Sequence, residues 1–491
     1  MTADAVPTLY QWFAETAVRV PDATALAVGP NSFSYRELSA TAAGVARRLR
    51  ELTPRPRVGL LASRTPLAYA GYLGVLRAGG TVVPLNPEYP AGRNRMLAER
   101  GGLDVVLADM EADVAFASAA GIPVLGPEDV DAADPAEPPT DACPDDVAYI
   151  LFTSGSTGVP KGVPIRHRNA AEFVRLHVDR YDVRPGCRLS QTFGLTFDPS
   201  VFDMFVAWAG GATLVVPTRE ELLDPVTYVA DRALTHWYSV PSIISMARSA
   251  GTLIPGSMPS LRWSLFAGEQ LTLDHAAAWA DAAVNSTVEN LYGPTELTVT
   301  VTTYRLPPDR GSWPVTSNGT VPIGRIHPHL EHRLESETGE LQVRGPQRFA
   351  GYLDPADDAG HFLDPRTGLP TATPGPDAWY RTGDRVGDEQ GQLVHLGRLD
   401  QQVKVLGQRI EPGEIEAALR TRCGVDDAVV LVGDADRLVA VYTGAERTPA
   451  ELRAQLRAHL PAHMVPRRFV HRTDLPLNAN GKVDRLACGR L

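Results

Sequence analysis

Short apolar strands alternate with helical segments along much of this 491-residue chain. The segment VGLLA at 58–62 has the character of a buried strand, and a helix through LAYAGYLGVLRAGG and a second strand at TVVPL follow it. The same alternation recurs between residues 147 and 300. Strands joined through helices pair in parallel, and helices cover both faces of the resulting sheet. The sequence therefore predicts an α/β fold with helix-covered sheets.

The character of the chain changes near Asp400. A chain of this length is expected to form two or more domains. Beyond Asp400 a strand (QVKVLG), a helix (PGEIEAALR), two strands (DAVVLVG and RLVAVYTG) and a helix (AELRAQLRAHL) predict a small α+β unit. We therefore expect domains at 1–399 and 400–491. Two stretches rich in turn-forming or small residues, 109–146 and 354–378, are predicted to be surface connections.

Composition and charge argue against several classes of protein. No apolar stretch approaches the roughly 20 residues that span a bilayer, and the first residues do not form a secretory signal, so we expect no membrane association. The net charge is −11 without a basic stripe, which argues against nucleic-acid binding. The cysteines lie far apart, which predicts a reduced, cytoplasmic location. They are Cys143, Cys187, Cys423 and Cys488.

Lysine is rare in this chain, with three lysines against 44 arginines. Lys161, Lys404 and Lys482 each lie within a motif rich in glycine and polar residues. Lysine supplies a compact point charge, whereas arginine supplies a planar fork, so the two are not interchangeable at a phosphate or carboxylate oxygen. Codon bias explains the scarcity but not the placement. The three positions therefore predict phosphate or carboxylate chemistry.

The segment VAYILFTSGSTGVPKGV, residues 147–163, runs from an apolar strand into a loop of small residues that ends at Lys161. Backbone N–H groups and the hydroxyls of Thr153, Ser154, Ser156 and Thr157 can bind phosphate oxygens in such a loop. The spacing does not match the GxxxxGK[ST] pattern of P-loop proteins. A Ser/Gly-rich loop alone is often a solvated linker, but the preceding strand and the following lysine favour an anion site.

The string TSGSTGVPKG closely resembles the signature of the adenylate-forming superfamily, which contains the adenylation domains of nonribosomal peptide synthetases, acyl- and aryl-CoA ligases, and firefly luciferase. Further strings resemble the same superfamily and follow in its order. They are FSYREL, VLRAGGTVVPLNPEYP, FDPSVFDMF, NLYGPTE, GELQVRG, YRTGD, GRLDQQVKVLGQRIEPGEIE, LPAHMVP and NGKVDR. The resemblance implies a large N-terminal adenylation core and a small, mobile C-terminal lid.

The resemblance also implies ATP and Mg²⁺ as cofactors. Glu296 corresponds to the Mg²⁺ ligand, Lys482 to the lysine that bridges the substrate carboxylate and the α-phosphate, and Lys161 to a cation of the phosphate loop. Tyr292 corresponds to the residue that packs on adenine, and Asp384 to the carboxylate that accepts the ribose hydroxyls. The full set implied to bind the nucleotide is Thr153, Ser154, Gly155, Ser156, Thr157, Gly158, Asn290, Tyr292, Gly293, Thr295, Asp384 and Arg398.

Two residues are implied to act when the lid rotates. Asp400 corresponds to the hinge, and Lys404 to a residue that assists the second half-reaction, although a solvated Lys404 is the alternative. Four positions depart from the common family pattern. Leu406 lies where arginine is usual, Pro412 lies where leucine is usual, and His395 and His463 lie where tyrosine is common.

Asp198 indicates the class of substrate, because in amino-acid-activating members an aspartate here pairs with the α-ammonium. A buried, unpaired carboxylate is costly, so such a pocket rejects acids without an amine. The alternative is that Asp198 is an ordinary helix N-cap. The remaining pocket positions carry no second charge, which predicts a small apolar side chain. They are Pro199, Phe202, Tyr238, Leu265, Ala267, Gly268, Leu291, Val299 and Thr300.

This pocket set resembles that of L-prolyl-AMP ligases that load discrete carrier proteins. The resemblance predicts activation of L-proline as prolyl-AMP and transfer to the phosphopantetheine thiol of a carrier, for pyrrole-2-carboxyl formation in an antibiotic pathway. The alternatives are another small apolar amino acid such as alanine or valine, an acyl- or aryl-CoA ligase, or a nonenzymatic scaffold. Because the chain has no GG-x-S carrier site after residue 485 and no HHxxxDG motif, we expect a stand-alone enzyme whose carrier acts in trans.

Overall fold

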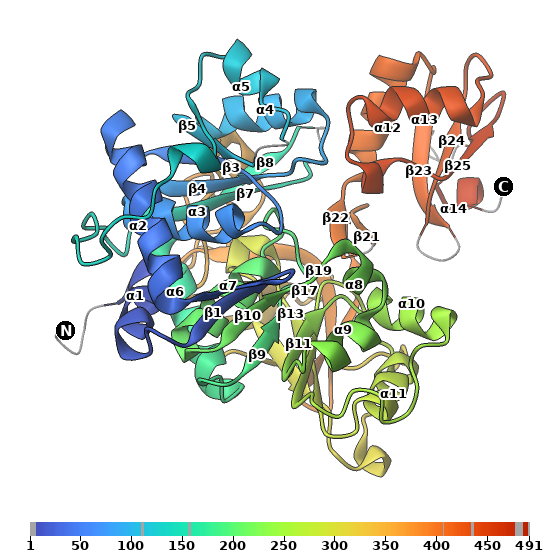
Figure 1. The fold of residues 1–491 in the computed structure, drawn as a ribbon. Helices are drawn as coiled ribbons and strands as arrows, with labels where there is room; N and C mark the ends of the chain where they lie inside the picture. Colours follow the sequence, from blue (N-terminus) through green and yellow to red (C-terminus); the bar gives the residue numbers. More distant parts are fainter. Residues whose placement is uncertain are drawn as a thin grey trace.

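The computed structural model describes residues 6–109, 112–155, 159–405, 407–433, 437–476 and 485–489. These residues form a large N-terminal domain and a small C-terminal domain, drawn in orange to red in Figure 1. This arrangement confirms the predicted fold class. None of the helices in the described residues is long and apolar enough to cross a membrane.

The largest sheet of the described residues has nine strands in the order β15-β14-β13-β12-β11-β9-β10-β1-β2. Its central strands are parallel, and β2, β14 and β15 pair antiparallel at the two edges. The strands are β1 (Thr24–Val28), β2 (Asn31–Ser34), β9 (Arg188–Ser190), β10 (Thr213–Val216), β11 (His236–Ser239), β12 (Trp263–Phe266), β13 (Thr287–Tyr292), β14 (Thr302–Arg305) and β15 (Arg325–Ile326).

A second sheet has the order β6-β5-β3-β4-β7-β8 and is parallel except for the β7–β8 hairpin. Its strands are β3 (Arg57–Leu61), β4 (Thr81–Leu85), β5 (Val105–Ala108), β6 (Val124–Leu125), β7 (Val147–Thr153) and β8 (Lys161–Arg166). The strand, helix and strand predicted between residues 58 and 85 are β3, α3 (Pro66–Arg77) and β4. The predicted surface connection at 109–146 is wrong in part, because α5 (Ala115–Ala119) and β6 lie within it and bury Phe116 and Leu125.

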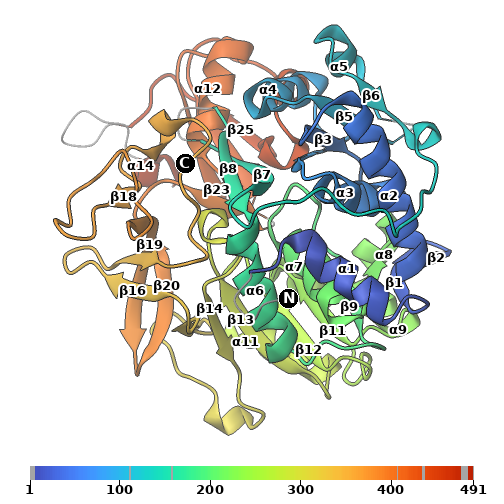
Figure 2. The same cartoon turned by 90° about the vertical axis from the view of Figure 1, so that its left-hand side faces the viewer.

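Helices pack around and between these two sheets (Figure 2). Residues of α1, α3 and α7 share one apolar core with strands of both sheets. The helix α7 begins at Pro199, whose ring fixes a helical φ at the first turn. The helices of the large domain are α1 (Leu9–Arg19), α2 (Tyr35–Leu52), α3 (Pro66–Arg77), α4 (Ala91–Gly101), α5 (Ala115–Ala119), α6 (His167–Arg180), α7 (Pro199–Gly210), α8 (Arg219–Leu223), α9 (Pro225–Asp231), α10 (Ser242–Ala250) and α11 (Leu273–Ala282).

A third sheet completes the large domain and carries part of the site. Its strands are β16 (Glu331–Leu334), β17 (Glu340–Arg344), β18 (Phe362–Leu363), β19 (Trp379–Glu389) and β20 (Gln392–Arg398). The antiparallel β19–β20 pair places Asp384 directly opposite Arg398. Two sequence motifs are thereby joined at one point of the fold.

The small domain begins with a β-hairpin and has its own core. Val405 and Ile410 of the hairpin pack with Ile415, Leu419 and other residues of this domain. The domain contains β21 (Val403–Val405), β22 (Gln408–Ile410), α12 (Pro412–Cys423), β23 (Ala428–Gly433), β24 (Arg437–Tyr442), α13 (Pro449–Arg457), β25 (Arg468–His471) and α14 (Arg485–Gly489). The hairpin therefore moves with the small domain if the two domains rotate.

Candidate functional site

A cavity of about 580 Å³ opens where the strands β12 and β13 end and the small domain begins. The carboxyl ends of parallel strands are a common place for ligand sites. Residues of both domains line this cavity. We call it the nucleotide cavity because its lining includes residues that the resemblance implies to bind the nucleotide. Several site residues predicted from the sequence line this cavity. They are Gly268, Asn290, Leu291, Tyr292, Gly293, Asp384, Arg398, Asp400 and Lys404.

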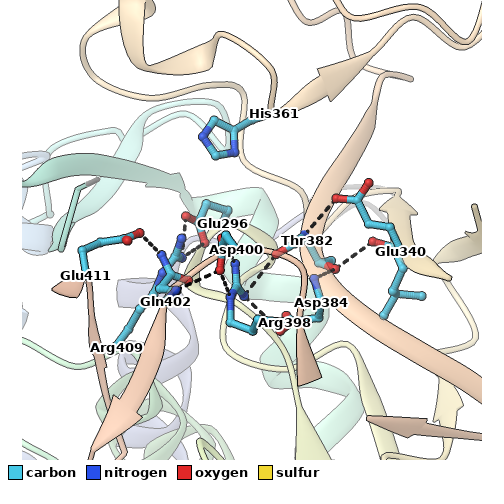
Figure 3. A network of polar contacts seen from close by, with 12 residues as sticks. Glu296, Glu340, His361, Thr382, Asp384, Arg398, Asp400, Gln402, Arg409 and Glu411 are labelled. Carbon is cyan, nitrogen blue, oxygen red and sulfur yellow. Dashed lines mark hydrogen bonds and ion pairs between the residues drawn. The ribbon is translucent and has the colours of Figure 1, made fainter. Parts of the chain in front are cut away.

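Asp384 is the centre of a polar network in the cavity wall (Figure 3). Arg398 Nη1 lies 2.9 Å from its Oδ1, and Tyr292 Oη donates to its Oδ2 over 2.6 Å. His395 Nε2 lies 3.1 Å from Oδ1. Burial alone would raise the pKa of the Asp384 carboxyl, but the His395 contact and the charges of Arg398 and Lys404 hold it well below its usual range. The carboxylate is therefore ionised and positioned to accept hydrogen bonds.

Arg398 also binds Asp400, which lies between β20 and the β21–β22 hairpin (Figure 3). Its Nε and Nη2 each lie 2.7 Å from a carboxylate oxygen of Asp400. Asp400 in turn accepts a hydrogen bond of 3.1 Å from the Gln402 backbone N–H. The connection between the domains is thus tied to the network around Asp384.

Asn290 leaves an acceptor free in the wall of the nucleotide cavity. Its Nδ2 donates to the carbonyls of Val321 and Pro322 over 3.0 Å each, whereas its buried Oδ1 has no partner among the described residues. An unpaired buried acceptor is costly unless a ligand donor reaches it. The cavity size, this acceptor and the ionised Asp384 together fit a nucleotide that carries amine and hydroxyl donors.

The loop predicted to bind phosphate lies in the hairpin between β7 and β8. Thr153 and Lys161 face each other at its base. Gly155 lies so close to the Val159 carbonyl that a Cβ would clash with it. Ser154 Oγ donates to the Arg409 carbonyl of the small domain over 2.9 Å. Ser156, Thr157 and Gly158 lie outside the described residues.

Lys161 lies against a second buried cluster. Its Nζ lies 5.0 Å from the centre of the Tyr352 ring and 3.2 Å from His361 Nε2. Burial and the charge of Lys161 lower the pKa of His361 to about 4, so the imidazole is neutral near pH 7. Because Tyr352 Oη donates to Glu296 over 2.8 Å, Lys161 and Glu296 are linked through one tyrosine.

Glu296 is fully buried and binds a cation from the small domain (Figure 3). Arg409 Nη1 lies 2.9 Å from its Oε1 and 3.1 Å from its Oε2. Burial opposes ionisation, but Arg409 and hydrogen bonds, including that of Tyr352, lower the pKa of Glu296 to about 2. The Arg409 guanidinium thus supplies the positive charge beside Glu296 that a metal ion would supply. Carboxylate oxygens are ligands that Mg²⁺ prefers, so Glu296 fits the implied metal. No cluster of three potential metal ligands occurs among the described residues, so a metal here needs further ligands such as phosphate oxygens.

Gly407 brings the β21–β22 hairpin into contact with the large domain. Its N–H donates to Glu269 Oε1 over 2.6 Å. The glycine has φ of +74°, and a Cβ at this position would clash with Val240. Glycine is therefore required for this close approach.

Lys404 lies in the wall of the nucleotide cavity and is half-buried. Its Nζ lies 5.9 Å from the centre of the Tyr292 ring. Burial lowers the pKa of Lys404, although the nearby Asp384 and Asp198 oppose this shift. The structure thus places Lys404 at the site and not on a solvated face.

Lys482 lies outside the described residues, so its catalytic role stays a prediction from the sequence. The described residues on either side pack on the small domain. Leu475 belongs to an apolar cluster with Val429 and Val441, and Arg485 donates to the Val430 carbonyl over 3.0 Å.

Asp198 occupies the N-cap position of α7 without acting as a cap. Its φ of −58° and ψ of −29° are helical, and its side chain makes no capping hydrogen bond. Asp198 is buried, with an exposed fraction of 5%. Burial raises the pKa of Asp198 to about 7, against a hydrogen bond with Thr295 and the charge of Lys404. The N-cap alternative therefore does not explain this carboxylate.

Asp198 lines a cavity of about 50 Å³, which we call the side-chain pocket. Of the residues predicted to form this pocket, the structure gathers Asp198, Pro199, Tyr238, Ala267, Gly268 and Val299. Phe202, Leu265 and Thr300 do not line it, and Leu291 faces the nucleotide cavity instead. Phe202 packs behind Tyr238, with ring centres 4.8 Å apart.

Several residues of the site are not predicted from the sequence. Phe197, Gly407 and Arg409 line the side-chain pocket, and Glu269 holds the hairpin. Phe197 begins the string FDPSVFDMF, and Gly407 and Arg409 lie in GRLDQQVKVLGQRIEPGEIE, so all three belong to strings that resemble the superfamily. Their roles depend on contacts between distant segments.

Comparison with known proteins gives consistent matches along the chain. The profile described as AMP-binding enzyme matches residues 13–353, and that of the AMP-binding enzyme C-terminal domain matches residues 414–482. Phosphinothricin tripeptide synthetase PhsC of Streptomyces viridochromogenes is 37% identical over 98% of this chain and 45% of its own length. Tyrocidine synthase 2 of Brevibacillus parabrevis is 33% identical over 98% of this chain and 13% of its own length. The chain thus spans less than half of these curated relatives.

Solved structures give the same picture. IdnL7 is 40% identical, with a TM-score of 0.74 and 98% of each chain covered. The adenylation domain AlmE of Vibrio cholerae, in complex with glycyl-adenosine-5'-phosphate, is 27% identical, with a TM-score of 0.83 over 98% of this chain and 97% of its own. Holo-PA1221, which contains adenylation and PCP domains, is 25% identical, with a TM-score of 0.80 over 98% of this chain and 84% of its own.

Proposed function

This chain belongs to the AMP-binding enzyme family, and we propose that it activates L-proline as prolyl-AMP and transfers the prolyl group to the thiol of a carrier protein. The buried carboxylate of Asp198 in the side-chain pocket carries this proposal. A buried carboxylate in a pocket of about 50 Å³ favours a small substrate with an ammonium group, since the ion pair offsets the cost of burying the charge.

The walls of the pocket support a small apolar side chain. The walls formed by Pro199, Tyr238, Ala267 and Val299 are uncharged. Charged side chains also line the pocket, namely those of Asp384, Arg398, Lys404 and Arg409. A site of this kind disfavours fatty and aryl acids, because these leave Asp198 unpaired. The alternatives to proline are alanine and valine, and the glycyl adenylate bound to AlmE adds glycine.

In the first half-reaction, a carboxylate oxygen of the amino acid attacks the α-phosphorus of ATP, and diphosphate leaves. Asp384 and Asn290 would hold the nucleotide, while Lys161 and the sequence-predicted Lys482 would offset the phosphate charge. Glu296 would hold Mg²⁺, which when bound shields the charge of the phosphate oxygens. Positioning of the two reactants supplies the rest of the rate enhancement.

In the second half-reaction, the carrier thiolate attacks the carbonyl carbon of the adenylate, and AMP leaves with the bonding electrons. The position of Lys404 supports its predicted part in this step, because Lys404 lines the side-chain pocket together with Asp198 and Asp384. Arg409 lines the same pocket. We further propose that the prolyl carrier supplies pyrrole-2-carboxyl formation in an antibiotic pathway.

Exchange of labelled diphosphate into ATP tests the first half-reaction. The panel contains L-proline, L-alanine, L-valine, glycine and benzoate, and L-proline is expected to give the highest rate. Highest exchange with another amino acid would overturn the proline assignment, and exchange with benzoate alone would overturn the amino-acid class. Intact-mass measurement of a separately supplied carrier protein then tests transfer, with an expected mass increase of one prolyl group.

A further inference from the structure

Arg93 and Glu414 form an ion pair between the two domains. Arg93 lies on α4 of the large domain and Glu414 in the first turn of α12, and Arg93 Nη1 contacts Glu414 Oε1. Both side chains are buried, with exposed fractions of 9% and 2%. Figures 1 and 2 both show α4 beside α12. This pair is therefore part of an interface and not a surface charge contact.

The geometry of the pair indicates a role other than net stabilisation. Arg93 Nε and Glu414 Oε2 are buried without a partner among the described residues. A buried ion pair with unsatisfied atoms does not recover the full cost of removing both charges from water. However, a buried charge without its partner costs much more free energy than the pair. Each residue therefore strongly favours the domain orientation that brings its partner into contact.

The pair lies close in the chain to the groups at the site. Glu414 follows Arg409 by five residues, and α12 directly continues the β21–β22 hairpin. The ring centre of Tyr89, which precedes α4, lies 6.5 Å from that of His463 in the small domain. This adds a second contact between the two domains. Fixing the first turn of α12 on α4 therefore fixes the hairpin that carries Lys404 and Arg409.

We infer that Arg93 and Glu414 are positioning residues for thioester formation, because their ion pair holds the small domain with Lys404 and Arg409 in the site. Neither residue lines the nucleotide cavity or the side-chain pocket. The inference rests on the proposed two half-reactions. It requires that loss of the pair slows transfer to the carrier without an equal loss of adenylate formation.

The test compares Arg93→Met, Glu414→Met and the double variant with the wild type and with Arg95→Met. Arg95 lies on the same helix in an exposed pair with Glu99, so it is a matched control. Diphosphate exchange measures the first half-reaction, and single-turnover loading of the carrier from preformed adenylate measures the second. We expect transfer to fall at least 10-fold in all three variants while exchange stays within 3-fold, and no change in the control.

The double variant keeps the test informative if a single variant unfolds, because replacing a buried pair by apolar residues is often neutral for stability. Small-angle X-ray scattering is expected to show a changed domain arrangement in this variant at an unchanged thermal midpoint. Unchanged transfer, or an equal loss in both half-reactions, would overturn the inference. Failure of the wild type to exchange diphosphate with any acid would instead overturn the proposed function.

Discussion

Glu296 of the large domain is bound by Arg409 of the small domain, whose Nη1 lies 2.9 Å from Oε1 and 3.1 Å from Oε2. The same carboxylate is the proposed Mg²⁺ ligand. A guanidinium and a divalent cation cannot occupy one carboxylate together without strong charge repulsion. The orientation of the small domain and the binding of metal are therefore expected to oppose each other.

Substitution of Arg409 by methionine removes the competing cation. We expect the Mg²⁺ concentration that gives half-maximal diphosphate exchange to fall several-fold, because Glu296 becomes free for the metal. Mn²⁺ binding followed by electron paramagnetic resonance, in the presence of a nonhydrolysable ATP analogue, is expected to tighten in parallel. An unchanged metal requirement would show that Arg409 does not compete. The exposed Arg310, changed to methionine, is the control.

The activity of the enzyme is expected to depend on the ionisation of Asp198. Burial raises the pKa of Asp198 to about 7. At lower pH the carboxylate is therefore converted to the neutral form, which cannot pair with an ammonium group. The value of kcat/KM for the amino acid should therefore fall below pH 7 and be about 10-fold below its plateau at pH 6. Asp198→Asn should be about 100-fold less active at all pH values and lack this inflection. An inflection near pH 4 in the wild type would contradict the assignment.

Lys482→Ala is expected to abolish most adenylate formation. The predicted lysine compensates charge that develops between the carboxylate and the α-phosphate, and loss of one such group typically costs about 100- to 1,000-fold in kcat. Diphosphate exchange measures this loss. Transfer of a prolyl group from chemically supplied adenylate should remain within a few-fold of the wild type. Normal exchange by the variant would refute the role predicted from the sequence.

Lys404→Ala is expected to give the reverse pattern. Because Lys404 lies in the cavity in the orientation described here, loading of the carrier should slow by about 10-fold or more, with exchange nearly unchanged. Single-turnover loading with radiolabelled proline measures the effect. Equal slowing of both half-reactions would argue for a general role of this lysine in nucleotide binding.

Ala267→Leu is expected to narrow the choice of substrate. Ala267 is buried and lines the side-chain pocket, so three added carbon atoms compete with the side chain of the amino acid. Each methylene group is worth about 1–3 kcal/mol in such a pocket, so kcat/KM for proline should fall at least 100-fold, and that for glycine much less. Equal losses for both amino acids would indicate a disturbed fold, which thermal unfolding can detect.

The sequence predicts those features that depend on local patterns. The alternation of strand and helix gives β3, α3 and β4, and the motif around Asp384 and Arg398 leads to two residues that pair directly across β19 and β20. The segment 109–146 is rich in alanine, aspartate, glutamate and proline, and this composition predicts a surface connection. Packing of its few apolar side chains decides otherwise.

Other features depend on side-chain direction and on contacts between distant segments. Phe202 lies one helical turn from Asp198, yet its ring packs behind Tyr238 and not in the pocket. Arg409 and Glu296 are 113 residues apart, so no local pattern indicates that they meet. The ion pair of Arg93 with Glu414 spans 321 residues and depends entirely on how the domains are placed.

The residues that line the side-chain pocket come from separate segments of the chain. Asp198, Tyr238, Ala267 and Val299 belong to one stretch of the large domain, whereas Lys404, Gly407 and Arg409 come from the β21–β22 hairpin. Mutations in the first stretch can thus alter the choice of acid while the hairpin, with its proposed part in transfer, is unchanged. This separation makes the walls a natural unit for evolutionary drift, recombination and directed evolution toward new building blocks.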